Sequence, residues 1–282
     1  ARLLEAGLVT EPREQSYYEG GTAFLDRFIN RVTFPVRDAR GRTVAFGGRI
    51  LPGSDGPKYW NSLESELFRK SEILFGFDLA REGMRRSETA VVVEGYTDVI
   101  LAHQHGLNNC VAVMGTALTE AHVLQLKRFV RKIVLLLDGD AAGTRATGRS
   151  LPTLLAHEVD LRVLSLPSGL DPADYLQQFG AEALRGQIEG AIEAWEYKLR
   201  LSMEQYGLDS IDARQRVLDE MLELISHEPR QPGPARENLL LSTLAQRCLL
   251  DERAVRQRLK ESRQKRRGKV AAPHFAGDSA KA

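Results

Sequence analysis

Two pairs of acidic residues follow apolar runs in the middle of this chain: Glu94 with Asp98, and Asp138 with Asp140. A glycine lies between the two members of each pair, which permits a tight turn as the chain leaves the apolar run. In open α/β folds ligands bind at the carboxyl ends of the strands, where such carboxylates would gather. Because hard divalent cations prefer oxygen ligands, the pattern predicts a Mg²⁺-dependent enzyme that acts on phosphate esters or nucleotides. Asp138 and Asp140 are two residues apart, so both side chains point to one face of an extended chain.

The elements that must position these acids are short β-rich runs separated by helix-length segments, from Ser87 to about Leu166. We predict strands over 90–93, 110–113, 133–137 and 161–166, and helices over 97–105, 119–131 and 142–157. Short runs rich in Val and Leu that are joined by helices are typical of a parallel sheet with right-handed crossovers. The fold class predicted for this part is therefore α/β.

The region before this sheet, residues 1 to about 85, predicts a β-hairpin with strands over 32–36 and 44–49. Pro35 cannot donate a hydrogen bond to a ladder, which favours an edge position. Gly47 and Gly48 predict a bulge, or a place where another backbone or a ligand comes close. The chain begins without Met and within a helix-like pattern, so we expect a fragment.

The region from about Ala181 to Lys269 shows no strand signal. Its large apolar residues recur at helical spacing, as in Trp195 and Leu199, which indicates buried helix faces. Residues 231–234 contain two prolines and a glycine and divide this helical region. The basic block over 256–269 holds eight Lys or Arg residues and only Glu261 as an acid, which fits a helix end that runs into a flexible tail.

Length and composition set further limits. A chain of 282 residues predicts two or three domains. It has neither an apolar run of about 20 residues nor a signal-peptide layout, so we expect a cytoplasmic protein without a membrane span. Cys110 and Cys248 form no metal or redox motif and read as small buried residues. The net charge is only +1, but the segment from Arg27 to Arg49 contains six arginines and a single acid, Asp38. Such a basic surface could hold phosphates, although charge alone favours a solvated hairpin surface.

A family resemblance extends over roughly residues 25 to 180. The pairing of Glu94-Gly95 and Asp98 with Asp138-Gly139-Asp140 resembles the Toprim domain of primases, topoisomerases and related nucleases. Further motifs occur in the order found in the DnaG-type bacterial primase core: Phe34-Pro35-Val36-Arg37-Asp38, Phe46-Gly47-Gly48-Arg49, Pro57-Lys58-Tyr59-Trp60-Asn61-Ser62, Phe68-Arg69-Lys70, Leu74-Phe75-Gly76, Gly115-Thr116 and Asp138-Gly139-Asp140-Ala141-Ala142-Gly143.

The resemblance implies roles for the acidic residues. Glu94 resembles the Toprim glutamate, which is a metal ligand or the general base toward the attacking ribose hydroxyl. Asp98 resembles the acid that supports it, and Asp138 and Asp140 resemble the aspartates that hold the divalent metals, Mg²⁺ or Mn²⁺. Nucleotidyl transfer by two cations needs several carboxylates that converge from different loops, in agreement with this assignment.

A later Asp-Pro-Asp motif of the family is only partly matched. Asp171 matches its first acid and is implied as a further metal ligand, whereas Ala173 stands at the position of the second. Asp174 lies one residue later, and that shift changes the direction of its side chain. Basic residues of the family's cleft, implied to hold template and nucleotide phosphates, match here at Arg37, Arg49, Lys58 and Lys70.

A structural alternative exists for the acids, because Asp98 and Asp138 could cap the helices that follow them. Four acids at two strand ends, together with the matched basic segments, favour the catalytic interpretation. The implied fold is a Toprim domain, preceded by a partial basic α/β subdomain and followed by helices. The expected division is 1–86 for the basic subdomain, 87–178 for the Toprim domain, 179–269 for the helical subdomain and 270–282 for a flexible tail.

The resemblance implies DNA-directed synthesis of short RNA primers from ribonucleoside triphosphates on a single-stranded DNA template. Two alternatives remain: a Toprim nuclease or topoisomerase, and a non-catalytic module for single-stranded DNA or helicase docking. Primases of this type also carry an N-terminal zinc module and a C-terminal module that docks the replicative helicase DnaB. Neither is matched by this sequence, so we expect zinc and DnaB to engage parts that this chain does not include.

Overall fold

The computed structural model describes residues 2–11, 24–137, 151, 154, 159–167, 169–226 and 234–270. The chain divides into two compact units, which we describe separately. The first comprises 1–150 and 159–193, and the second comprises 151–158 and 194–282. None of the described helices is long and apolar enough to cross a membrane.

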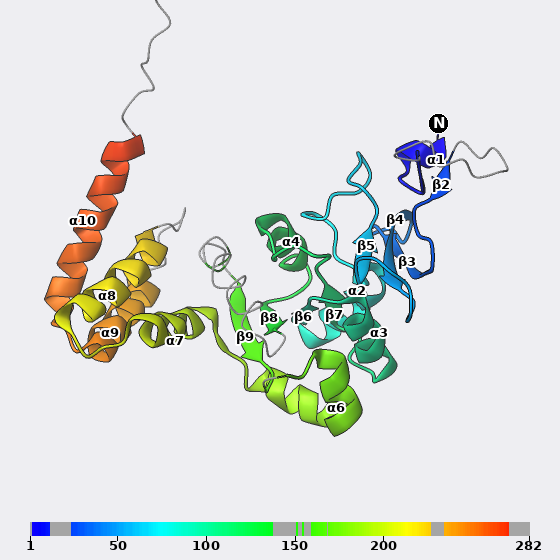
Figure 1. Ribbon diagram of the computed structural model, residues 1–282. Coiled ribbons are helices and arrows are strands. Elements are labelled where there is room, and N and C mark those ends of the chain that lie inside the picture. Colours follow the sequence, from blue (N-terminus) through cyan, green and yellow to red (C-terminus); the bar gives the residue numbers. More distant parts are fainter. Residues whose placement is uncertain are drawn as a thin grey trace, which may run out of the picture. The chain divides into compact units, whose positions relative to one another are not determined.

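A five-stranded sheet in the order β10-β9-β8-β6-β7 forms the centre of the first unit (Figure 1). Its strands are β6 (Thr89–Val93), β7 (Cys110–Ala112), β8 (Lys132–Leu137), β9 (Asp160–Ser165) and β10 (Ile192–Glu193). All neighbours are parallel except β10, which is antiparallel to β9. The pairing of Val92 with Leu135 brings the carboxyl ends of β6 and β8 to the same edge. This arrangement confirms the predicted α/β class with a mostly parallel sheet.

Both faces of this sheet are covered. The helices of the unit are α2 (Phe77–Ser87), α3 (Tyr96–Gln104), α4 (Glu120–Leu126) and α6 (Pro172–Glu189). Helices α3 and α6 pack on the face that carries Val91, Val93 and Leu136, through side chains such as Val99 and Leu176. The alternate strand residues point to the other face and are buried as well, so β6 is buried at all five positions. Burial on both faces explains why these strands read as continuous apolar runs.

Antiparallel sheets form the N-terminal part of the same unit. These elements are α1 (Arg2–Glu5), β1 (Val9–Thr10), β2 (Leu25–Asp26), β3 (Arg31–Arg37), β4 (Thr43–Ile50) and β5 (Tyr59–Asn61), with β1 paired to β2 and a second sheet in the order β3-β4-β5. Pro35 lies on the edge strand β3, as predicted.

The predicted role of Gly47 and Gly48 needs correction. The register irregularity lies at Val36/Arg37, opposite the far end of β4, and the two glycines pair regularly. Their lack of a side chain instead admits two aromatic rings. A Cβ on Gly47 would lie 2.5 Å from the ring of Tyr96, and one on Gly48 would lie 2.7 Å from the ring of Phe28.

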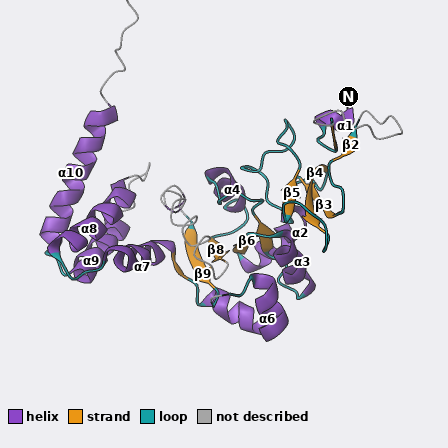
Figure 2. Cartoon of the chain, viewed as in Figure 1, coloured by secondary structure: helices purple, strands orange, loops and turns teal. Residues whose placement is uncertain are grey.

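The second unit is helical over its described residues 194–226 and 234–270, which Figure 2 shows without an orange strand. Its helices are α7 (Ala194–Tyr206), α8 (Ile211–Ser226), α9 (Pro234–Cys248) and α10 (Glu252–Val270). Trp195 and Leu199 are buried, as their spacing predicted. Arginines of the basic block over 256–269 form ion pairs. Arg258 pairs with Asp219 at 2.9 Å, and Arg263 pairs with Glu237 at 2.8 Å.

Two element predictions were wrong, and a third is not tested. The absence of strands after Ala181 is contradicted by β10, which forms because Ile192 and Glu193 add to the edge of β9. Helix α4 ends at Leu126 rather than near Arg131, because the backbone amides of Arg131 and Lys132 bond to the carbonyl of Glu88 and draw the chain into the sheet. The predicted helix over 142–157 lies almost wholly outside the described residues.

Candidate active site

Glu94 and Asp98 flank the turn between β6 and α3. Glu94 is exposed directly after the buried strand, whereas the Asp98 side chain is only 5% exposed in the first turn of the helix. Gly95 is the N-cap residue of α3, with φ −114° and ψ 152°, so Asp98 does not cap the helix. A Cβ on Gly95 would lie 2.5 Å from Oδ2 of Asp98, which leaves room for glycine alone. The turn therefore holds the Asp98 carboxylate against the backbone that carries Glu94.

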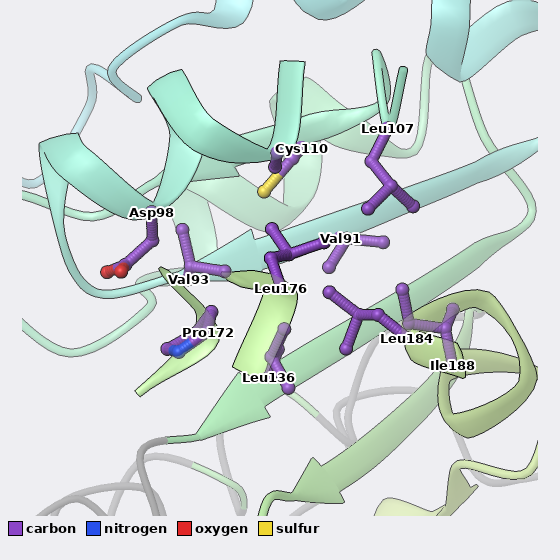
Figure 3. A pocket seen from close by; sticks show the side chains of 11 residues that line it. Val91, Val93, Asp98, Leu107, Cys110, Leu136, Pro172, Leu176, Leu184 and Ile188 are labelled. Carbon is purple, nitrogen blue, oxygen red and sulfur yellow. The ribbon is translucent and has the colours of Figure 1, made fainter. Parts of the chain in front are cut away.

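A small cavity of about 10 Å³ lies beside Asp98 between α3, α6 and the sheet (Figure 3). Its lining is apolar apart from the Asp98 carboxylate, and its size admits about one water molecule. Figure 3 shows Asp98 and Pro172 at the same end of this cavity. Burial, and secondarily the charge of Asp98, raises the pKa of the Cys110 thiol, which therefore stays protonated as predicted for a buried cysteine. The start of α6 and the side chain of Asp98 therefore both border this cavity.

Asp171 is the N-cap residue of α6. Its Oδ1 accepts a hydrogen bond from the backbone N–H of Asp174 at 2.7 Å. Ala173 is buried, whereas the side chain of Asp174 is exposed. Asp171 therefore has a structural role as a cap, and the neighbouring Pro172 brings it to the same region as Asp98.

The other two predicted metal ligands, Asp138 and Asp140, lie outside the described residues. Within the described part of the chain, no group of three or more His, Cys, Asp or Glu side chains is arranged to hold a metal ion. Leu137, the last residue of β8, ends the strand that is paired in parallel with β6, at the edge where Glu94 emerges. The carboxylate oxygens of Glu94, Asp98 and Asp171 are donors of the kind that a hard divalent cation prefers.

Tyr96 connects this region to the antiparallel sheet. Its ring stacks on Phe34 with centroids 5.4 Å apart and meets Phe75 edge-on at 4.7 Å. Its hydroxyl donates a hydrogen bond to Oδ1 of Asn61, and Nδ2 of Asn61 donates to the carbonyl of Met114 at 3.2 Å. Burial raises the pKa of the Tyr96 hydroxyl, which keeps it protonated as a donor. No sequence pattern singles out Tyr96 or Asn61, although Asn61 lies in one motif of the resemblance and Tyr96 lies between Glu94 and Asp98.

The predicted basic residues have different environments. Arg49 and Lys58 lie over the ring of Tyr59, at 5.6 Å and 5.8 Å from its centroid. Arg37 instead forms an ion pair with Asp78 at 3.6 Å, which compensates part of its charge.

Lys70 lies in a loop fixed from two sides. Its backbone N–H donates to the carboxylate of Glu64 at 3.2 Å. Thr119, the N-cap residue of α4, donates from its hydroxyl to the carbonyl of Ser71 at 2.6 Å. Of the four predicted phosphate-binding residues, the structure brings Arg49 and Lys58 together around Tyr59.

Comparison with known proteins relates this geometry to a family. Residues 1–81 match the family described as DNA primase catalytic core, N-terminal domain, and residues 91–176 match the Toprim-like family. The crystal structure of a DNA primase domain from Pseudomonas aeruginosa is 35% identical, with a TM-score of 0.79 over 90% of this chain and 78% of that chain. A DnaG primase catalytic domain solved with single-stranded DNA is also 35% identical, with a TM-score of 0.75 over 86% of this chain and 76% of that chain.

This chain belongs to the DnaG-type primase family. The curated DNA primase of Deinococcus radiodurans is 44% identical over 222 residues, which are 78% of this chain but 38% of that protein. The chain thus spans about two fifths of the length of such a primase and corresponds to the catalytic core. Toprim domains generally use divalent metal ions.

Proposed function

We propose that this chain is the catalytic core of a DNA primase that synthesises short RNA primers on single-stranded DNA by nucleotidyl transfer. The observation that carries the proposal is the position of Glu94 at the carboxyl end of β6, beside the parallel strand β8 that leads directly into Asp138. In the proposal, the ends of both strands supply carboxylates at one edge of the sheet, and the fold aligns with a solved primase domain along 90% of this chain.

In this proposal Glu94, Asp138, Asp140 and Asp171 hold Mg²⁺ or Mn²⁺. When bound, the metal supplies positive charge that activates the attacking 3′-hydroxyl and neutralises the leaving pyrophosphate. In this role the carboxylate of Glu94, which is exposed, binds metal or accepts the hydroxyl proton. Asp98 is a positioning residue, because its carboxylate lies against the backbone of Gly95, the residue that directly follows Glu94.

The basic residues supply the charge that nucleotide and template phosphates require. Arg49 and Lys58 form no ion pair with a carboxylate among the described residues, so their charge is available to a phosphate. Arg37 and Lys70 complete the proposed nucleotide and template surface. A single-stranded DNA template is supported by the related catalytic domain solved with single-stranded DNA, and duplex contact by the related domain of Mycobacterium tuberculosis primase solved with double-stranded DNA.

The proposed subdomains and their roles are those of the primase family. Residues 1–86 form the basic subdomain, 87–178 the Toprim domain and 179–269 the helical subdomain, followed by a tail over 270–282. Zinc-dependent template reading and docking on the helicase DnaB are assigned to regions of the longer primases outside the aligned part.

The experiment that tests the proposal is incorporation of labelled ribonucleotides on single-stranded DNA, with Mg²⁺ or Mn²⁺. We expect the parent to form RNA oligomers and Glu94→Gln to form none. The matched control is Glu204→Gln, which changes an exposed glutamate on α7 and should leave incorporation unchanged. Binding of DNA without any incorporation by the parent would instead support the non-catalytic module.

A further inference from the structure

Trp60 forms a second cationic and aromatic cluster that the proposed active site does not use. Its side chain is 38% exposed on the edge strand β5. The guanidinium carbons of Arg27 and Arg31 lie 5.0 Å and 5.1 Å from the centroid of its ring. Both distances are within the range of a cation–π contact. A large aromatic surface with two arginines is thus presented to solvent.

The two arginines are held by backbone rather than by acids. Arg31 donates to the carbonyl of Pro57 at 2.8 Å, and Arg27 donates to the carbonyl of Asn61 at 3.3 Å. Neither forms an ion pair with a carboxylate in the described part of the chain. Nε of Arg27 is buried without a hydrogen-bond partner, and burial lowers the pKa of this arginine. Both positive charges therefore remain available to an anionic ligand.

This cluster lies on the opposite face of the sheet from Tyr96. Trp60 pairs with Gly48, and the space above Gly48 is filled by the side chains of Phe28 and Arg31. Tyr59 is adjacent to Trp60 in the strand, so its side chain points to the other face, where it approaches Tyr96 with centroids 6.2 Å apart. The Trp60 face is therefore distinct from the face that meets the candidate active site.

We propose that Trp60, Arg27 and Arg31 form a stacking site for an unpaired base of single-stranded DNA, with the arginines bound to the adjacent phosphates. Proteins that bind single strands combine aromatic rings for the bases with cations that follow the backbone, and both are present here. The site recognises a single strand because the bases of a duplex are already stacked on one another. The proposal rests on the proposed function in that the strand is the primase template.

A purely structural role would also place arginines beside Trp60. In that case the ring only orients Arg27 and Arg31, and no base contacts it. The two roles differ in one observable, the environment of the Trp60 ring when DNA is bound. The chain contains only two tryptophans, and the other, Trp195, is 6% exposed in the second unit. Trp60 fluorescence can thus be followed in a Trp195→Phe variant, or as the difference between the parent and Trp60→Phe.

The experiment titrates the Trp195→Phe variant with an oligodeoxythymidylate about 12 nucleotides long, a length within the range of single-strand sites. Fluorescence of Trp60 and anisotropy of an end-labelled copy of the oligonucleotide are recorded together. We expect quenching that saturates at the same concentration as the anisotropy. Trp60→Ala should weaken binding roughly 5- to 150-fold, as for the loss of one stacked base, and Trp60→Phe should retain most of the affinity. Leu79→Ala, at an exposed leucine of α2, is the control and should bind as the parent does.

Two results would overturn the inference. If anisotropy reports binding while Trp60 fluorescence and the affinity of Trp60→Ala are unchanged, the stacking site is wrong and the proposed primase function stands. If the parent does not bind the oligonucleotide at any concentration tested, both the stacking site and the proposed function are contradicted. Should Trp195→Phe unfold, the difference spectrum between the parent and Trp60→Phe gives the same readout.

Discussion

The hydroxyl of Tyr96 donates a hydrogen bond to Oδ1 of Asn61, and this bond joins the first residue of α3 to the edge strand β5. Nδ2 of Asn61 in turn donates a hydrogen bond to the carbonyl of Met114. The acidic turn of the Toprim sheet and the strand β5, which carries Trp60 and directly follows Lys58, are thereby held together by a part-buried chain of two hydrogen bonds. This link is internal to the first unit and fixes the candidate phosphate-binding strand next to the candidate carboxylates.

Tyr96→Phe removes this link while keeping the ring. The amide oxygen of Asn61 loses its donor, so we expect the free energy of unfolding to fall by about 1 to 3 kcal/mol. Chemical denaturation measures the change, and Asn61→Ala completes a double-mutant cycle that should be non-additive. Tyr197→Phe is the control, because that buried tyrosine of α7 has no comparable hydrogen bond among the described contacts. Additive effects would show that the bond contributes nothing.

Gly95→Ala should abolish incorporation, because the new Cβ would fall 2.5 Å from Oδ2 of Asp98 and displace the turn that carries Glu94. The matched control is Gly186→Ala in α6, where no atom lies within 4 Å of the added Cβ. That substitution should stabilise the protein by up to about 1 kcal/mol through helix propensity. Thermal unfolding and incorporation are measured on both variants. Full activity in Gly95→Ala would contradict the described turn.

His122 predicts a pH dependence of stability. Its side chain is fully buried at the start of α4, and burial lowers its pKa from 6.5 to about 4. The backbone of Lys70 and Ile73 and the charge of Glu72 oppose this shift only in part. Because the unfolded chain binds the proton more readily, the stabilisation from neutral His122 is fully present above pH 6.5. It is lost as the pH falls toward 4, by at most about 3 kcal/mol.

The measurement is chemical denaturation of the parent and of His122→Gln between pH 7.5 and 4, a range set by the ordinary histidine pKa. His122→Gln should be less stable at neutral pH, and its difference from the parent should shrink as the pH falls. His105→Gln, at an exposed histidine after α3, is the control and should follow the parent. A constant difference across the range would mean that His122 does not titrate between the folded and unfolded states.

Divalent metal should stabilise the chain. Carboxylates that converge on one site repel one another when no cation is bound, and a ligand that binds only the folded state stabilises it by about 2.7 kcal/mol at one hundred times its dissociation constant. We expect Mg²⁺ or Mn²⁺ to raise the melting temperature of the parent. Asp138→Asn should raise the metal-free melting temperature and remove most of the response. An equal response in parent and variant would exclude Asp138 as a ligand.

The buried sheet could be predicted from sequence because its strands are dense in Val and Leu, and the ends of β6 and β8 were placed within one residue. The two-residue strand β10 could not, because Ile192 and Glu193 become a strand only through pairing with β9. The early end of α4 likewise depends on hydrogen bonds to Glu88, which is remote in sequence. A local sequence pattern does not indicate pairing with residues that are remote in the chain.

In the candidate site, too, features set by consecutive residues could be predicted, and contacts between remote residues could not. Glu94 and Asp98 were predicted correctly as residues of a strand end and a first helical turn, because strand, glycine and acid are consecutive. The bond between Tyr96 and Asn61 joins residues 35 positions apart and has no periodic signal. The cluster of Trp60 with Arg27 and Arg31 has no periodic signal either, although the excess of arginine in this segment is visible in the sequence. The number of arginines can be counted from the sequence, but the aromatic ring that they contact in the fold cannot be predicted from it.

The central claim, that the Toprim carboxylates catalyse primer synthesis, is tested most directly by ribonucleotide incorporation on single-stranded DNA. The parent and Asp138→Ala are compared at high protein concentration with Mg²⁺ or Mn²⁺. The account predicts template-dependent RNA oligomers from the parent and none from Asp138→Ala, with both proteins folded. Equal incorporation by the two proteins, or no product from the parent even on a pre-annealed primer, would contradict it.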